Sequence, residues 1–135
     1  MKIRLTALAA VLMAGAPQGD AAAGGRGIAW HDCRTSPVDE TGQRLAEAGA
    51  SCGEVTVPLE HGDPGGRTLS VAVARRPASD PARRLGTLMV DIGGPGPSRD
   101  GVALVAKGLP PEVPFGAPAI AARYDLVGID PRFFG

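Results

Sequence analysis

One segment of the chain, residues 87–130, restricts the possible folds most strongly. It begins with a strand-like run at 87–92 that is apolar at 88–90 and 92, passes through a turn rich in glycine and proline at 93–97, and ends in a second strand-like run at 124–130. Residues 100–107 between the two runs carry enough apolar side chains for a short helix. A strand, a turn, a helix and a strand make a βαβ unit, which is right-handed and has parallel strands. The apolar residues at 88–90 and 92 predict that the first strand is covered on both faces.

A second pattern, with a period of two, precedes this unit. In the segment that begins at residue 54, Val55, Val57 and Leu59 point to one side. Residues 69–73 repeat this alternation after the turn-forming stretch 61–66. Two antiparallel strands joined as a hairpin are predicted. The expected fold class is therefore α/β, with an antiparallel hairpin that leads into a parallel βαβ unit.

The remaining segments predict less regular structure. Residues 40–50 contain only Leu45 and three alanines as apolar residues, which predicts a short helix or an irregular loop. Four prolines between 110 and 118 exclude a long helix before the last strand. Trp30 is expected to anchor the early part of the chain onto the domain.

The amino terminus has the layout of a secretory signal peptide at residues 1–23. A positive start at Met1–Arg4 precedes an apolar run at Leu5–Ala16, and Ala21 and Ala23 offer a small-residue cleavage site. The apolar run is shorter than the roughly 20 residues needed to span a bilayer. We expect a secreted or periplasmic protein that is not embedded in a membrane.

Charge gives no reason to expect a nucleic-acid partner. Removal of residues 1–23 would leave 12 lysines and arginines against 13 acidic residues. A chain so close to neutral lacks the positive surface that attracts nucleic acid or anionic lipid.

Two cysteines, Cys33 and Cys52, are the only ones in the chain. An oxidising compartment would let them pair, and closing that loop would contribute roughly 3 kcal/mol. Two unpaired buried thiols are the alternative. Their spacing matches no zinc pattern and only His31 is nearby, so we expect neither a metal nor another cofactor.

The glycine and proline turn can be compared with a phosphate-binding loop. A dinucleotide fingerprint would need a small residue where Arg99 stands, and the Lys-Ser/Thr pair of a Walker loop is absent. Pro95 and Pro97 also remove two N–H donors that a phosphate would need. Phosphate binding is therefore not predicted.

Ser98 in the same turn resembles a hydrolase nucleophile only in part. Asp100 occupies the position of the second glycine of G-x-S-x-G, and both histidines, His31 and His61, precede the serine. A serine without a base is not activated. Ser98 is interpreted as a helix N-cap or turn hydroxyl, and a compact triad using His61 has no supporting motif.

Backbone donors are the remaining option for this turn. A strand that ends in Gly-Gly-Pro-Gly can expose the N–H groups of Gly93 and Gly94, since no side chain screens them, while Pro95 stiffens the bend. Such donors stabilise the negative oxygen formed during acyl transfer. A plain turn between strand and helix fits the same residues equally well.

Five motifs, in order, resemble the secreted α/β-hydrolase exopeptidases of the tripeptidyl aminopeptidase and prolyl aminopeptidase type. They are Trp30 with Cys33, Cys52 followed by Val57-Pro58-Leu59-Glu60-His61, the pair Ala74-Arg75, the loop Gly93-Gly94-Pro95-Gly96, and Tyr124-Asp125-Leu126-Val127-Gly128-Ile129-Asp130-Pro131-Arg132. The resemblance extends over nearly the whole chain after the signal peptide.

The resemblance implies that residues 24–135 are the N-terminal part of an α/β-hydrolase domain. Gly93 and Gly94 would be oxyanion-hole donors, and Pro95 and Gly96 would shape their loop. In the family the nucleophile lies on the next strand-turn-helix unit, so this chain would hold no catalytic residue and would be inactive alone. The resemblance implies that a full-length protein of this family would act on a peptide or small acyl substrate. A non-catalytic secreted module with the same front half is the alternative.

The resemblance also implies a further strand beside residues 87–92, so that an isolated fragment would expose an apolar strand edge. Phe133 stands where the family has a glycine that permits a tight turn, and Asp91-Ile92 replaces the usual Asn-Pro before the glycines. Both differences fall in loops.

Other polar residues are expected to have ordinary roles. Asp130 would pair with Arg132 or cap a turn, and His61 would lie in a surface turn. Four arginines would be solvated: Arg75, Arg76, Arg83 and Arg84.

Overall fold

The structure is a computed structural model that describes residues 27–94, 96–107 and 117–134. The proposed signal peptide and Pro95 lie outside the described residues. Five strands form one sheet: β1 (His31–Asp32), β2 (Ser51–Pro58), β3 (Thr68–Arg76), β4 (Gly86–Val90) and β5 (Tyr124–Ile129). The helices are α1 (Glu40–Glu47), α2 (Gly101–Lys107) and α3 (Ala117–Arg123), with single 3₁₀ turns η1 (Pro81–Arg83) and η2 (Ser98–Asp100).

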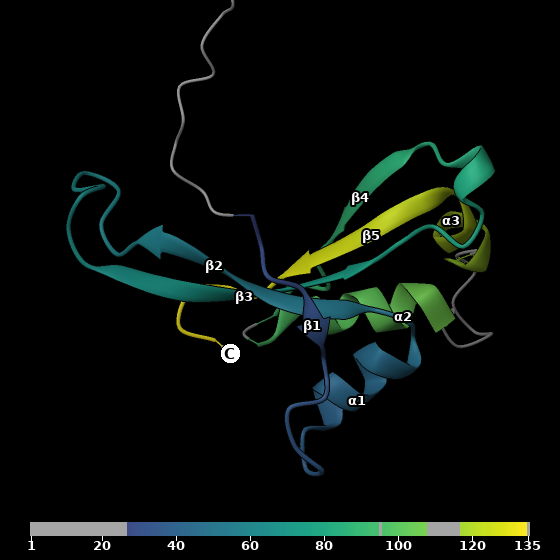
Figure 1. Cartoon of the computed structure of the whole chain (residues 1–135), viewed down its shortest axis with the longest axis horizontal. Coiled ribbons are helices and arrows are strands. Elements are labelled where there is room, and N and C mark those ends of the chain that lie inside the picture. Colours follow the sequence, from purple (N-terminus) through teal and green to yellow (C-terminus); the bar gives the residue numbers. More distant parts are fainter. Residues whose placement is uncertain (1–26, 95, 108–116, 135) are drawn as a thin grey trace, which may run out of the picture.

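The strands lie in the order β1-β2-β3-β5-β4 (Figure 1). β2 and β3 are antiparallel, with Val55 opposite Val71, and β4 runs parallel to β5. The predicted hairpin and βαβ unit are therefore both confirmed, as is the mixed α/β class. The two units join through an antiparallel contact between β3 and β5, in which Ala74 lies opposite Gly128.

One face of the sheet carries the core. Leu45 of α1, Val102 of α2 and Ala121 of α3 are buried together against Ala74 and Leu126 of the sheet. Full burial of a leucine or valine side chain, such as Leu45, Leu126 or Val102, contributes roughly 1.5–3 kcal/mol to the stability of the fold. Helices from three parts of the sequence thus close over a single face.

The opposite face is only partly covered. Ile28 and Trp30 lie over Gly53 of β2, and Trp30 keeps 39% of its surface exposed. Toward the other edge, Met89 and Ile129 are 58% and 42% exposed. The expectation that the strand at 87–92 is covered on both faces is wrong, because the described helices pack on the face that carries Leu126.

A disulfide between Cys33 and Cys52 ties β1 to β2, as predicted. Both cysteines are at least 97% buried within the core cluster. The two-residue strand β1, where His31 lies opposite Cys52, was not predicted, since two residues are too few to show a period.

Residues 40–47 form the helix rather than the irregular loop. The Asp39 side chain accepts a hydrogen bond from the Gly42 N–H at 2.8 Å and caps the helix. Arg44 of α1 reaches Asp100 of η2, with its Nη2 3.0 Å from Oδ2. This ion pair fixes α1 against the turn that follows the glycine loop.

A short helix, α3, precedes β5 despite the prolines. Pro118 falls in its first turn, where a missing N–H costs no helical hydrogen bond. In the described part of the chain, none of the helices has the length and apolar character that crossing a membrane requires.

Candidate functional site

The glycine loop follows the carboxyl end of β4. Gly93 and Gly94 adopt φ angles of +68° and +81°, the left-handed region that only glycine enters without strain. Both residues are exposed, and nothing lies within 4 Å of where a Cβ would stand on either. The sequence places two successive glycines here because the backbone turns sharply away from the sheet.

Asp91 closes this loop. Its Oδ1 accepts hydrogen bonds from the Gly93 N–H at 2.8 Å and from the Ser98 hydroxyl at 3.1 Å. Ser98 is 4% exposed and is the first residue of η2, whose N-cap is Pro97. The interpretation of Ser98 as a helix N-cap is wrong, because Pro97 occupies that position. The alternative, a turn hydroxyl, is confirmed, because the Ser98 hydroxyl donates to Asp91 seven residues upstream, across the loop. Asp91 was not singled out, although an Asp two residues before a glycine is typical of an Asx turn.

A buried ion pair holds the far end of the loop. The Asp130 carboxylate accepts a hydrogen bond from the Arg99 N–H at 2.8 Å, and its Oδ2 lies 3.1 Å from Arg99 Nε. The Asp130 side chain is fully buried, and burial raises the pKa of this carboxyl while the Arg99 hydrogen bond opposes the shift. The expected partner Arg132 instead contacts the β2–β3 hairpin. Asp130 therefore anchors the turn after the glycine loop.

Close packing at Gly128 supports this anchor. A Cβ there would lie 2.7 Å from Arg99 Cα and 3.1 Å from Val102 Cγ2. Only a glycine lets η2 and α2 approach β5 so closely. The position of the loop thus depends on β5 as much as on β4.

Neither histidine lies at Ser98. His31 Nδ1 is 2.8 Å from the Asp32 carbonyl oxygen, and His61 Nε2 is 3.3 Å from Arg132 Nη2. His61 is exposed in the turn between β2 and β3, which confirms its surface location. The described residues therefore bring together backbone donors and the Asp91 carboxylate at the glycine loop, and neither histidine contacts Ser98.

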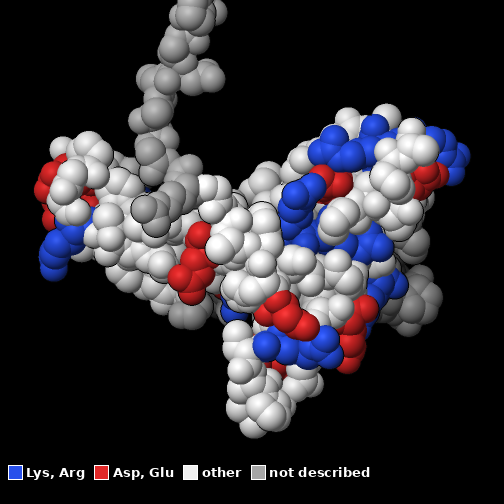
Figure 2. All heavy atoms as spheres, viewed as in Figure 1, with Lys and Arg blue, Asp and Glu red and all other residues white. Residues whose placement is uncertain are grey.

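The four arginines expected to be solvated are mostly paired. Arg75 and Arg84 both donate to Asp125 Oδ2, at 2.8 and 3.1 Å. Arg76 donates to the carbonyl oxygen of Ala48, and Arg83 pairs with Asp80. Figure 2 shows blue Lys and Arg atoms in the region of β4 with red Asp and Glu atoms among them. Arg75, Arg83 and Arg84 are nevertheless exposed, as expected, whereas Arg76 is partly buried. The partners of these arginines were not predicted.

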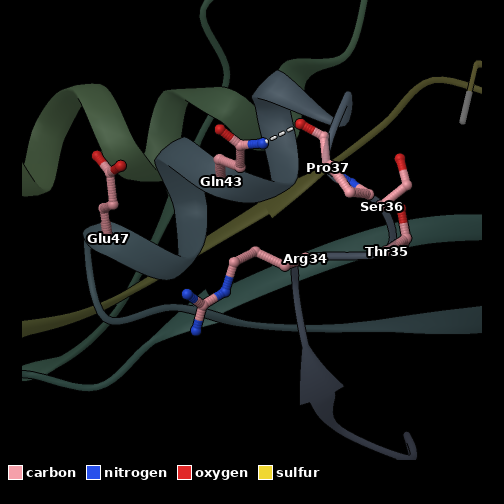
Figure 3. A pocket seen from close by; sticks show the side chains of 6 residues that line it. All are labelled: Arg34, Thr35, Ser36, Pro37, Gln43 and Glu47. Atoms are coloured by element: carbon pink, nitrogen blue, oxygen red, sulfur yellow. Dashed lines mark hydrogen bonds between the residues drawn. The ribbon is translucent and has the colours of Figure 1, made fainter.

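The pocket in Figure 3 lies away from the glycine loop. It has a volume of about 430 Å³ and is lined by Arg34, Thr35, Ser36, Pro37, Gln43 and Glu47. Gln43 donates to the Pro37 carbonyl, Arg34 pairs with Asp32, and Glu47 pairs with Lys107. With these polar groups already engaged, the pocket is no second candidate site. Among residues 27–94, 96–107 and 117–134, no three His, Cys, Asp or Glu side chains are placed to hold a metal ion.

Comparison with known proteins points to hydrolases. The chain is 38% identical over 112 residues to a putative hydrolase of Mycobacterium bovis and to carboxylesterase B of Mycobacterium tuberculosis, covering 78% of this chain and 18% of each relative. It is 36% identical over 109 residues to serine protease Hip1 of Mycobacterium tuberculosis, covering 80% of this chain and 18% of that protein. No family model matches the chain.

The chain therefore spans less than a fifth of the length of these curated relatives. Their names support the predicted relation to serine hydrolases. The exopeptidase type stays a prediction.

Proposed function

We propose that this chain is the N-terminal part of a secreted serine hydrolase that releases residues or short peptides from the amino termini of peptides. Residues 1–23 would direct its export. The nucleophile, the acid and the histidine of the triad would come from the remainder of the hydrolase domain, so the chain alone would be inactive.

The observation that carries this proposal is the position of the glycine loop. Gly93 and Gly94 present exposed backbone at the carboxyl end of β4, a strand of a parallel pair. Ligands of open α/β sheets bind at that end of the strands. In a chain similar to proteins named as hydrolases, exposed N–H groups there suit the oxyanion of an acyl-transfer intermediate.

The two donors differ in the chemistry they offer. The Gly93 N–H is hydrogen-bonded to the Asp91 carboxylate, whereas the Gly94 N–H has no acceptor among the described residues. We assign the Gly94 N–H as the first donor to a substrate oxyanion. The Gly93 N–H would join it when Asp91 moves aside.

A chimera tests this role, because the donors need a nucleophile to serve. Residues 27–134 would replace the matching segment of Mycobacterium tuberculosis carboxylesterase B, and hydrolysis of a p-nitrophenyl ester would be followed. In an active chimera, Gly94→Val should lower kcat about 100-fold with little change in KM, because the side chain screens the donor and shifts the loop. Gly49→Val is the matched control, since Gly49 has φ +77° and equally open surroundings outside the loop.

Equal kcat values for the two valine variants of a folded chimera would refute the oxyanion role. The isolated chain gives a second check with tripeptidyl p-nitroanilides. Turnover by the purified chain that disappears in Ser98→Ala would refute its proposed inactivity. The aminopeptidase type is tested by joining the chain to its downstream coding sequence, in whichever frame encodes G-x-S-x-G, and comparing free with acetylated tripeptide substrates.

A further inference from the structure

Arg132 joins the segment after β5 to the end of the β2–β3 hairpin. Its Nη1 donates to the carbonyl oxygens of Pro58 and Leu59, both at 2.9 Å, and its Nη2 lies 3.3 Å from His61 Nε2. These partners are more than 70 residues away in sequence. Figure 1 shows the chain after β5 turning back beneath the hairpin.

The turn that carries Arg132 is not one that its own residues favour. Phe133 adopts φ +69°, a region in which a bulky residue is strained. Phe133 is also 81% exposed, so its side chain adds little packing. Within the turn, the Phe134 N–H donates to the Pro131 carbonyl at 3.1 Å. The contacts of Arg132 are therefore among the interactions that hold residues 131–134 against the hairpin.

The contact with His61 depends on the charge of the imidazole. An arginine side chain has donors only, so His61 Nε2 must be the acceptor, and the ring must be neutral with its proton on Nδ1. A protonated imidazole has two donors and no acceptor. Protonation would remove one hydrogen bond and bring two cations within 3.3 Å of each other.

Few other charges face this contact. Glu60, Asp63 and Arg67 lie in the same turn as His61, and none of them is hydrogen-bonded to its ring among the described residues. Arg132 is the charged group that reaches His61 from the segment after β5. The contact thus joins one imidazole to one guanidinium that stays positively charged at every pH considered.

We propose that His61 and Arg132 form a pH-sensitive clasp that holds residues 131–134 on the β2–β3 hairpin when His61 is neutral and loosens when His61 is protonated. The proposal is independent of the proposed function. Repulsion between two partly solvated charges at this distance lowers the ratio of closed to open segment about fivefold. The segment should therefore be more mobile at pH 5 than at pH 8, the interval in which histidines change charge.

Nuclear magnetic resonance of the full chain tests the clasp. The {¹H}–¹⁵N NOE of the Phe133 and Phe134 amides should fall between pH 8 and pH 5, with the same midpoint as the His61 ring protons. His61→Gln keeps a neutral acceptor at every pH, so its NOE values should stay high throughout. His31→Gln is the matched control, because it removes the other histidine and should leave the pH response unchanged.

Arg132→Met separates loss of the clasp from a general effect of acid. Its NOE values should be low at both pH values, because all three Arg132 contacts are gone. A pH response that persists in His61→Gln would overturn the proposal. So would a wild-type turn that stays rigid after His61 has titrated, or an Arg132→Met turn as rigid as the wild type at pH 8.

Discussion

Asp130, which directly follows β5, and Arg99, in the middle of η2, form a buried ion pair in which Asp130 Oδ2 lies 3.1 Å from Arg99 Nε. The side chains are 0% and 21% exposed. The contacts between these two residues fix the far end of the glycine loop to β5, the strand that pairs with β4.

The two halves of this pair should respond unequally to substitution. Arg99→Met leaves a buried carboxylate without a cation and should lower the free energy of unfolding by about 3 kcal/mol at pH 7. Asp130→Asn should cost about 1 kcal/mol, because an amide is cheaper to bury than a carboxylate and still accepts from the Arg99 N–H. Urea unfolding measures both values. A cost for Asp130→Asn that equals or exceeds that of Arg99→Met would contradict this account.

Asp125 should make the fold sensitive to acid. Hydrogen bonds from Arg84, the Ala78 N–H and Arg75 hold its pKa far below the usual value of 3.8, against the opposing effect of burial. A depressed pKa in the folded state contributes stability above pH 3.8 that is lost as the pH falls further. Asp125→Asn should therefore cost about 2–4 kcal/mol at pH 7 and lose less stability on acidification.

Urea midpoints at pH 7 and at pH 3 test the acid sensitivity. Asp63→Asn, in an exposed turn, is the control and should retain the wild-type loss between the two pH values. Asp130 should change the pH dependence of stability in the opposite direction, because its raised pKa makes the folded state more stable, relative to the unfolded state, as the pH falls. An Asp125→Asn protein that loses as much stability as the wild type would show that other groups dominate.

The Cys33–Cys52 disulfide should be a major contributor to stability. It closes a loop with a sequence separation of 19, for which chain entropy gives roughly 3 kcal/mol. Replacing both cysteines with alanine should lower the thermal midpoint by about 10 °C or more in a domain of this size. Intact mass before and after reduction verifies the bond, and an unchanged midpoint in the double variant would contradict the prediction.

The outer edge of β4 should promote self-association. Among the described strands, β4 pairs only with β5, and it carries the exposed side chain of Met89. A strand edge without a partner and with apolar side chains invites another strand. Met89→Lys should shift sedimentation toward the monomer. Val38→Lys, which places the same charge on an 86% exposed loop residue, should leave association unchanged. Equal effects of both lysines would attribute the change to net charge alone.

Asp91 should oppose negative charge at the glycine loop. Its Oδ1 lies 2.8 Å from the Gly93 nitrogen, so an oxyanion bound nearby would face a carboxylate. In the chimera with carboxylesterase B, Asp91→Asn keeps the acceptor and removes the charge, and kcat should rise about fivefold. Asp91→Ala also frees the Ser98 hydroxyl and should lose that gain. A lower kcat in Asp91→Asn would mean that the carboxylate assists the reaction.

Local patterns were enough to predict most of the sheet. The alternation around Val55 and Val71 and the apolar runs near 88 and 126 each depend on a few consecutive residues, so the hairpin and the βαβ unit could be predicted. At Phe133 the resemblance to the hydrolase family, rather than a local pattern, indicated a turn that suits glycine. The expectation that a glycine suits this turn agrees with its φ of +69°.

Contacts between distant residues could not be predicted in this way. Arg75 and Asp125 are 50 residues apart, and the arginine alone looks like any exposed cation. The partner of Ser98 was missed because the hydroxyl reaches back across the loop to Asp91. The roles of Gly93 and Gly94 as oxyanion donors stay predictions.

The strand order has a geometric consequence for the glycine loop. In the described part of the chain, β4 lies at one edge of the sheet, and its outer hydrogen-bonding groups face away from β5. A parallel strand added there would run about 4.8 Å from β4 and end at the same level. The residue that followed such a strand would lie beside Gly93 and Gly94. The spacing of the strands would therefore set the distance between the N–H groups of these glycines and a reactive side chain on that residue.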